Sequence, residues 1–333
     1  MKKKLISAGR RAGWLLLFPV CLGFLSCEEK EYAIPAAKTE LQNDVIKRSI
    51  GPNVAGLDIE FAYAMALASS RGKLVSAKVE ASLAGSEGTY LEHRSFYTDG
   101  GGQDVGVQIG APSVTSGNTT TVTFSKDTSA ATLRYFYKIP ESAKGQSVSF
   151  KFSATSSTGE TVSYDMGPYQ IAKMDTRLDI SVRDSVAAYI SLEDMKVYTV
   201  EEARANPGKI DLVYLYRNVP GITFNHSLIS PGAGSPYLAG VGVPAGAGRV
   251  SKIRKEWALR DRHLARAQFG VYIDDLDFEK LDFTGMPGEA LNMRAESGAW
   301  VETADGAYRA YIYFNSVNNN GKQAVISIKR YKS

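Results

Sequence analysis

Five carboxylates gather in one short segment of the 333-residue sequence. They lie in the stretch IDDLDFEKLDF and comprise Asp274, Asp275, Asp277, Glu279 and Asp282. Alternate carboxylates on one face of a strand or loop can bind Ca²⁺, but Lys280 stands where an EF-hand needs glycine. We interpret the segment as a solvated strand edge. The alternatives are a calcium site at Asp275, Asp277 and Glu279, or a pair of catalytic carboxylates.

The sequence lacks the other common patterns of catalysis. His93, His226 and His263 lie far apart, and no two of them have the spacing of metal ligands. The motifs HExxH, CxxC, GxSxG, GxGxxG and GxxxxGK[ST] are all missing. The glycine-rich stretch 230–249 does not end in the Lys-Ser/Thr pair that binds phosphate. We therefore expect a protein that is not an enzyme and needs no cofactor.

Aromatic side chains are the best candidates for ligand binding, because sugar rings stack their C–H faces on them. Trp257 and Trp300 lie in the second half of the chain. Tyr237 lies in the Gly/Pro-rich loop, where an exposed ring is free to meet a ligand. Packing in the core is the alternative for each of these three rings.

The first 26 residues have the pattern of an export signal. A basic start, MKKK followed by Arg10 and Arg11, precedes the apolar run 14–25. As a helix this run spans about 18 Å, which is less than the ~30 Å hydrocarbon core of a bilayer. We predict a signal peptide over residues 1–26 and no permanent transmembrane anchor.

Cys27 follows the apolar run directly, with Ser26 before it. This pair resembles a bacterial lipobox, in which the cysteine thiol is acylated and becomes the first residue of the mature chain. Phe24 and Leu25 depart from the commonest lipobox, which has leucine and a small residue there. An ordinary cysteine near a cleavage site is the alternative. We predict lipidation of Cys27 and attachment to a membrane through the lipid.

Removal of residues 1–26 changes the charge of the protein. The leader carries five of the 39 basic residues and none of the 35 acidic ones, so the mature net charge is about −1. A nucleic-acid-binding surface needs a surplus of positive charge, so nucleic acid is not an expected partner. Acylation of Cys27 would leave no thiol for a disulfide, and apolar burial must then stabilise the fold.

Residues 43–174 show the pattern of an all-β domain. The segments 73–83, 119–125, 132–139 and 147–156 are rich in β-branched residues or alternate with period two, and turn residues separate them. Residues 59–65 are rich in alanine, a helix former, but their aromatic alternation favours a strand. The segment therefore predicts an immunoglobulin-like β-sandwich.

Residues 184–333 predict a second β-rich domain with one or two short helices. Strands are expected at 186–192, 210–216 and 270–278. Thr199 and Glu202 form a capping box that begins a short helix, and residues 251–269 have near-helical apolar spacing. The C-terminal residues form two strands around Asn320-Gly321, which favours a type I′ hairpin. The domain boundary is expected between residues 174 and 184.

Together these features resemble a Bacteroidetes outer-membrane lipoprotein family of unknown function. The features are Cys27 with its acidic followers, the immunoglobulin-like domain, and the stretch VYTVEEARANPGKIDLVYLY. The layout is similar to that of surface glycan-binding lipoproteins from polysaccharide-utilisation systems. The resemblance implies an acidic tether over residues 27–42 and a position in the outer membrane that faces the cell exterior rather than the periplasm.

Asp184-Ser185-Val186 resembles the short O-glycosylation site of Bacteroidetes, which makes Ser185 a candidate, although three residues often match by chance. The function we expect is that of a lipid-anchored cell-surface protein that binds polysaccharide or another glycan. The alternative is a structural or assembly subunit of a pilus or cell-envelope complex, with an outer-membrane protein complex as partner.

Overall fold

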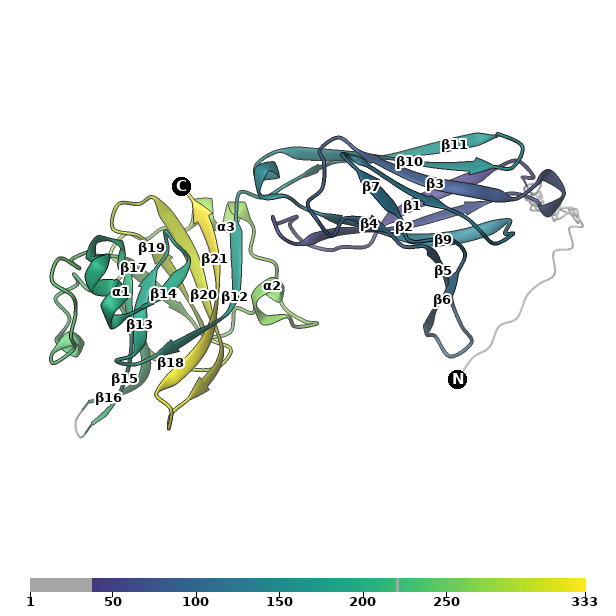
Figure 1. Cartoon of the computed structure of the whole chain (residues 1–333). Coiled ribbons are helices and arrows are strands. Elements are labelled where there is room, and N and C mark those ends of the chain that lie inside the picture. Colours follow the sequence, from purple (N-terminus) through teal and green to yellow (C-terminus); the bar gives the residue numbers. More distant parts are fainter. Residues whose placement is uncertain (1–37, 220–221) are drawn as a thin grey trace, which may run out of the picture. The chain divides into compact units, whose positions relative to one another are not determined.

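The computed structural model describes residues 38–219 and 222–333. The predicted signal peptide, Cys27 and most of the predicted tether lie outside these residues. Two β-rich parts follow one another along the chain, residues 38–171 and residues 172–333 (Figure 1).

The N-terminal part is a sandwich of two antiparallel sheets (Figure 1). One sheet contains, in spatial order, β1 (Gln42–Lys47), β2 (Asp58–Ala66), β9 (Ala130–Lys138) and β4 (Tyr90–Leu91). The other contains β11 (Thr161–Gln170), β10 (Ser147–Ser156), β3 (Leu74–Ala81), β8 (Thr119–Thr123) and β7 (Val114–Ser116). A separate hairpin consists of β5 (Arg94–Thr98) and β6 (Asp104–Gln108). The mainly β, immunoglobulin-like prediction is confirmed.

Strand β2 shows why this segment is a strand despite its alanines. Its large side chains, Phe61, Tyr63 and Met65 among them, alternate with smaller ones and are buried between the sheets. Phe61 packs edge-on against Phe150 and Phe152 of β10, with ring centroids 4.9 and 5.2 Å apart. A helix would scatter these side chains around its axis, so burial of one strand face outweighs the helix propensity of alanine.

The C-terminal part contains a ten-stranded antiparallel sheet. Its spatial order is β17 (Lys252–Glu256), β19 (Gly298–Glu302), β20 (Tyr308–Asn318), β21 (Gln323–Lys332), β12 (Asp175–Arg183), β13 (Ala187–Ser191), β15 (Leu212–Val219), β16 (Ile222–Ile229) and β18 (Glu289–Met293), and β14 (Lys196–Thr199) pairs with β13. Residues 175–183, which the sequence leaves between the predicted domains, pair with β21 and so belong to this sheet.

Three short α-helices occur among the described residues, where the sequence predicts one or two. They are α1 (Val200–Ala205), α2 (Arg262–Ala265) and α3 (Asp275–Lys280). The predicted capping box of α1 is confirmed, because Thr199 accepts from the backbone N–H of Glu202 and the Glu202 carboxylate accepts from that of Thr199. In the described part of the chain, no helix has the length and apolar character needed to cross a bilayer.

Two predicted elements of the C-terminal part are wrong. Residues 251–269 contain strand β17 and the single turn α2 instead of one helix, because Ile253 is buried while Lys252 and Arg254 on either side are exposed. Residues 275–280 form α3 instead of a strand. Asp274 accepts from the backbone N–H groups of Leu276 and Asp277, and this cap begins a helix.

The predicted C-terminal hairpin is confirmed, but its turn is not type I′. Asn318 pairs with Gln323, so four residues rather than two connect β20 to β21. The left-handed conformation falls on Lys322, with φ 48°, and not on Gly321. The side chain of Asn318 accepts from the N–H of Gly321 at 2.9 Å, which closes the longer loop.

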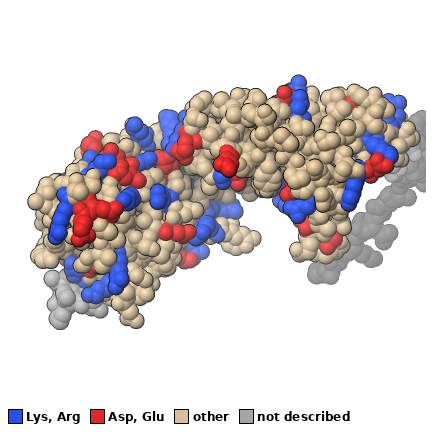
Figure 2. Space-filling model, in the orientation of Figure 1, with Lys and Arg blue, Asp and Glu red and all other residues tan. Residues whose placement is uncertain are grey.

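Short 3₁₀ turns link several strands. They are Ser69–Arg71 and Glu141–Ala143 in the N-terminal part, and Pro207–Lys209 and Pro236–Leu238 in the C-terminal part. On the face shown in Figure 2, basic and acidic side chains are interspersed over the C-terminal part, whereas much of the N-terminal sandwich is uncharged. Neither sign of charge forms a continuous field on that face.

We expect the Phe61→Ala substitution to lower the free energy of unfolding of the sandwich by about 3–5 kcal/mol, because it leaves a cavity between the sheets. Urea denaturation followed by circular dichroism measures this change. The matched control is Ala62→Ser, whose side chain points away from the core and should change stability by no more than about 0.5 kcal/mol. Equal effects of the two substitutions would contradict the assignment of the two faces of β2.

Candidate functional site

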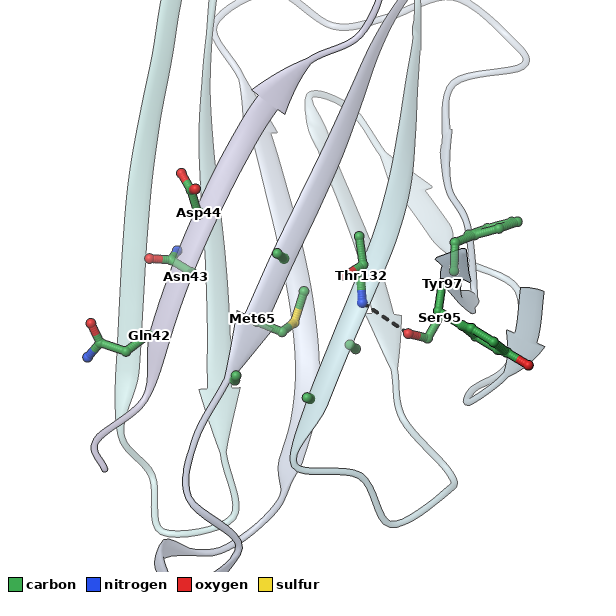
Figure 3. A pocket seen from close by; sticks show the side chains of 12 residues that line it. Gln42, Asn43, Asp44, Met65, Ser95, Tyr97 and Thr132 are labelled. Atoms are coloured by element: carbon green, nitrogen blue, oxygen red, sulfur yellow. Dashed lines mark hydrogen bonds between the residues drawn. The ribbon is translucent and has the colours of Figure 1, made fainter. Parts of the chain in front are cut away.

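The outer face of the β1-β2-β9-β4 sheet carries a shallow trough with a volume of about 480 Å³ (Figure 3). Ala64 and Ala66 of β2 form the middle of its floor, and Ala130 of β9 lies opposite Ala66. These alanines point away from the core, because Phe61, Tyr63 and the other large residues of β2 occupy its inner face. Because the methyl side chains of these alanines are short, the sheet surface is lower here than where longer side chains project on either side.

Strand β1 forms a polar side of the trough. Gln42 lies opposite Ala66 and Asp44 lies opposite Ala64, so both flank the alanine floor (Figure 3). Asn43 lies between them and donates to the hydroxyl of Tyr63 at 3.2 Å. Gln42 and Asp44 thus present one amide and one carboxylate to the trough, which are planar groups that can bind pairs of hydroxyls.

Strand β5 forms the other side, and it is attached to the sheet through a side chain. Ser95 accepts from the backbone N–H of Thr132 on β9 at 3.0 Å (Figure 3). Phe96 and Tyr97 follow Ser95 and also line the trough. The Tyr97 side chain is 55% exposed and extends away from β2 and β9, so it forms the rim (Figure 3).

Two arginines hold the Phe96 ring in place. The guanidinium of Arg134 lies over the ring at 4.2 Å from its centroid, and that of Arg94 at 5.4 Å. Arg134 also forms an ion pair with Asp104 of β6, which ties the hairpin to β9. Gly106 makes room for the ring, because a Cβ there would lie 3.0 Å from the Phe96 Cε1 atom. The β5 side of the trough is therefore rigidly positioned.

A second pair of rings lies on the same outer face. Tyr90 of β4 pairs with Phe136 of β9, and their rings stack with centroids 4.8 Å apart. Tyr90 is exposed, and burial of its hydroxyl, with the Glu92 charge as a smaller cause, raises the pKa of this phenol above its ordinary value. The face therefore offers exposed aromatic surface on both sides of Arg134.

The lining of the trough offers apolar, aromatic and polar groups for contact with a ligand. Asp44 is the one carboxylate among its lining residues, so the trough does not supply the two carboxylates that glycoside hydrolysis requires. Among the described residues, no three His, Cys, Asp or Glu side chains are grouped to hold a metal ion. An apolar floor, aromatic rings on one side and planar polar groups on the other suit a ligand that has both apolar faces and hydroxyls.

The three rings selected from the sequence have different environments. Trp300 is 5% exposed and packs against Phe278 and Tyr311, so it belongs to the core. Tyr237 is half-buried, and its ring packs edge-on against Phe224 at 4.8 Å. Trp257 is 57% exposed and is therefore the one ring of the three that is widely open to solvent. The structure does not gather them into one site.

Trp257 has a partly buried cation beside it. The Lys255 Nζ lies 3.6 Å from the centroid of the indole ring and donates to the carbonyl of Asn292 at 3.0 Å. Burial, together with the nearby charge of Arg294, lowers the pKa of Lys255 to about 8. This amine is thus neutral in an appreciable fraction of molecules under mildly alkaline conditions.

The acidic cluster is divided among separate structural contacts. Asp275 accepts from the backbone N–H of Lys173, Asp277 closes the capping box of α3, and Glu279 accepts from the Tyr331 hydroxyl. Burial raises the pKa of Asp275. The predicted strand edge is in fact a helix whose first turn is acidic. Carboxylates at this end of a helix interact favourably with the helix dipole.

Ser185 lies at the turn between β12 and β13, with φ 62°. It is exposed, and its hydroxyl donates to the Asp184 carboxylate at 3.0 Å. Asp184 also accepts from Arg217 at 2.5 Å, so this acid already has a structural partner. O-glycosylation of Ser185 stays a prediction.

The residues of the trough were not selected from the sequence, although a signal for them was present. The alternation that buries Tyr135 and Tyr137 necessarily places Arg134 and Phe136 on the opposite face of β9. The alanines of β2 alternate in the same way. No local pattern, however, shows that the β5–β6 hairpin lies beside these strands.

The structure defines the class of the protein: two consecutive mainly β domains, the first an immunoglobulin-like sandwich. The chain belongs to the DUF4466 family, a domain of unknown function whose profile matches residues 38–171. The profile of a second domain of unknown function, DUF8576, matches residues 172–333. A solved structure of a DUF4466 family protein from Parabacteroides merdae is 41% identical, with a TM-score of 0.85. The match covers 89% of this chain and 100% of that one.

Parabacteroides belongs to the Bacteroidetes, so the predicted kinship with a Bacteroidetes family of unknown function is confirmed. Two further solved structures are much more distant. The major pilin BcpA of Bacillus cereus is 8% identical over 87% of this chain and 66% of that one, with a TM-score of 0.28. The collagen-binding subdomain of the Enterococcus faecalis surface protein ACE is 10% identical over 38% of this chain and 92% of that one, with a TM-score of 0.21. Neither likeness carries an argument about function. A comparison with curated proteins finds no match.

We expect the fluorescence of Trp257 to change as the pH rises through about 8, because the Lys255 ammonium beside the indole then loses its charge. A Trp300→Phe variant makes Trp257 the one tryptophan of residues 27–333. The matched control adds Lys255→Met, which should abolish the transition. A transition near the ordinary lysine pKa of 10.5 would contradict the lowered value.

Proposed function

We propose that the protein is a lipid-anchored, non-catalytic cell-surface protein that binds a polysaccharide chain in the trough of its N-terminal sandwich. The observation that carries the proposal is the alanine floor between an amide- and carboxylate-bearing strand and two aromatic residues, Phe96, whose ring Arg134 holds, and Tyr97. Sugar rings combine apolar C–H faces with a rim of hydroxyls, and the two sides of the trough match these two kinds of surface.

The dimensions of the floor suit an extended chain of sugars. Neighbouring strands lie about 4.8 Å apart, so β1 and β9 on either side of β2 leave a floor roughly 10 Å wide. Successive side chains on one face of a strand lie about 6.8 Å apart. A sugar ring can therefore lie flat over Ala64 and Ala66, with its hydroxyls toward Gln42 and Asp44.

The charge of the sandwich favours a neutral glycan. Much of its face in Figure 2 carries no charged side chain. The trough itself contains one carboxylate, Asp44, and no lysine or arginine among its lining residues. An open trough of this kind desolvates little of either partner, so we expect weak binding to single oligosaccharides and stronger retention on a polymer that offers many sites.

The position of the trough agrees with display from a lipid anchor at Cys27. Leu41, just before β1, is already buried in the sandwich core. The thirteen residues between Cys27 and Leu41 let these two positions lie at most about 50 Å apart when the chain is fully extended. An anchored domain would therefore stay within this distance of the outer membrane, with Glu28, Glu29 and Glu31 in the tether. Outer-surface display remains part of the proposal.

An assembly role is the second candidate, and the β5–β6 hairpin favours it. This hairpin protrudes from the sandwich (Figure 1) and pairs with no third strand among the described residues. Tyr97 and Val107 on it are exposed. A strand with one free edge, such as β6 in the described part of the chain, can accept a strand from another protein of the envelope. Substitution of Val107 by lysine would weaken this pairing and leave the trough floor unchanged.

We expect Phe96→Ala and Tyr97→Ala each to weaken retention on an insoluble neutral polysaccharide about tenfold, which corresponds to about 1.4 kcal/mol per ring. Pull-down across a panel of polysaccharides measures the binding, and thermal denaturation confirms that the variants fold. Trp257→Ala, in the other domain, is the matched control and should bind as the wild type does. If no polysaccharide retains the wild type, and Val107→Lys separates it from an envelope complex, the assembly role replaces glycan binding.

We expect Cys27→Ser to move the protein from the membrane fraction to the soluble fraction of its native cells, because the serine hydroxyl cannot take the thioether-linked lipid. The matched control is Cys21→Ser, which removes the other cysteine of the sequence and should leave the protein in the membrane. Fractionation followed by immunoblotting gives the distribution. An unchanged distribution of the Cys27 variant would overturn the lipid anchor.

A further inference from the structure

The C-terminal domain completely buries a lysine and an aspartate that face each other. Lys329 of β21 and Asp261, which caps α2, have side chains that are 0% exposed, and the lysine Nζ lies 2.5 Å from the aspartate Oδ2. Leu264 and Ile273, both buried, flank Asp261, and Tyr311 is the sheet partner of Lys329. Removing a charged group from water is unfavourable. Burial therefore disfavours the charged form of the Lys329 amine.

The polar atoms around this pair suit the formation of an amide. Oδ1 of Asp261 accepts from the backbone N–H of Leu264 at 3.0 Å, a donor that can stabilise negative charge on this oxygen. The Lys329 Nζ donates to the carbonyl of Ile273 at 3.1 Å, which orients the amine. His263 Nδ1 lies 3.4 Å from Nζ and can accept a proton from it.

The protonation states favour the same reaction. Burial lowers the pKa of Lys329, which increases the fraction of nucleophilic amine. Burial, and then the charge of Lys329, lowers the pKa of His263 to about 4, so this imidazole is a neutral base near pH 7. One region without access to water thus brings together the carboxyl group of Asp261, the amine of Lys329, the Leu264 N–H as oxyanion donor and His263 as base.

We propose that Lys329 and Asp261 become joined by an intramolecular isopeptide bond once the domain has folded. A proton passes from the lysine to the carboxylate, which gives the neutral amine and acid. The Nζ lone pair attacks Cγ, and the N–H of Leu264 stabilises the charge that develops on Oδ1. His263 takes a proton from the attacking nitrogen and delivers it to Oδ2. The Cγ–Oδ2 bond then breaks, and Oδ2 leaves as water, so the reaction needs no oxidant, reductant or cofactor.

The bond would connect two elements that lie 68 residues apart in the chain. It would tie the last strand of the sheet to the loop before α2, and the new amide N–H would still face the carbonyl of Ile273. Other lysines beside carboxylates are not equivalent. Lys252 lies 2.9 Å from Glu302, but its side chain is 47% exposed, so water reaches this pair. Complete burial is what distinguishes Lys329.

The test is peptide mass spectrometry of the folded wild-type protein after denaturation and trypsin digestion. We expect a branched peptide in which residues 261–262 are joined to residues 323–330, with a mass lower by one water than the sum of the two peptides. Recovery of residues 261–262 and residues 323–329 as separate peptides, in full yield, would show an ordinary ion pair and overturn the proposal. This measurement needs no variant and so does not depend on whether a substituted chain folds.

Two variants extend the test. Lys252→Arg is the matched control, since it alters an exposed lysine–carboxylate pair and should leave the branched peptide unchanged. His263→Gln keeps a polar group beside Lys329 but removes the base, and we expect the branched peptide to form at least tenfold more slowly after refolding. An unchanged rate in this variant would overturn the role assigned to His263. Lys329→Arg, which keeps the charge but has no reactive amine, should yield no branched peptide.

Discussion

The packing of Phe61 against Phe150 and Phe152 between the two sheets is the interaction on which the N-terminal domain depends. With no cysteine between residues 38 and 333, this part of the chain cannot add a disulfide, so buried apolar surface must stabilise it. Because side chains alternate across a strand, the residues that fill the core also decide which neighbours face outward. The alanine floor of the trough thus lies on the outer face of β2, opposite the aromatic side chains that fill the core.

The C-terminal domain uses polar groups differently. Its acidic segment begins a helix, with Asp274 and Asp277 satisfying backbone N–H groups that would otherwise lack partners. Asp211 is buried and accepts both from the backbone N–H of Leu192 and from Arg249 at the end of the glycine-rich loop. Burial raises the pKa of Asp211, and the ion pair with Arg249 opposes this effect. Carboxylates that look reactive in the sequence therefore serve mainly to position loops and helix ends.

Most strands could be predicted from the sequence, because an antiparallel sheet with one buried face leaves a period-two pattern. The prediction failed where another force competed with this pattern. At 252–256 the five-residue strand is shorter than the apparent helical repeat around it, and at 275–280 helix capping outweighed the apolar alternation. Candidate sites were harder to predict, because Trp257 and Trp300 look alike in sequence while one is exposed and the other is part of the core.

The sequence by itself determined the fold class, the strand faces and the absence of disulfide bonds beyond residue 27, because alternation and composition are local properties of the chain. It also determined that the alanines of β2 oppose its aromatic residues. Only the tertiary structure decided that Ser95, Phe96 and Tyr97 lie beside those alanines, and that Lys329 meets Asp261 out of contact with water. Both contacts join residues that are distant in sequence, and no local pattern records which distant segments the packing of the sheets brings together.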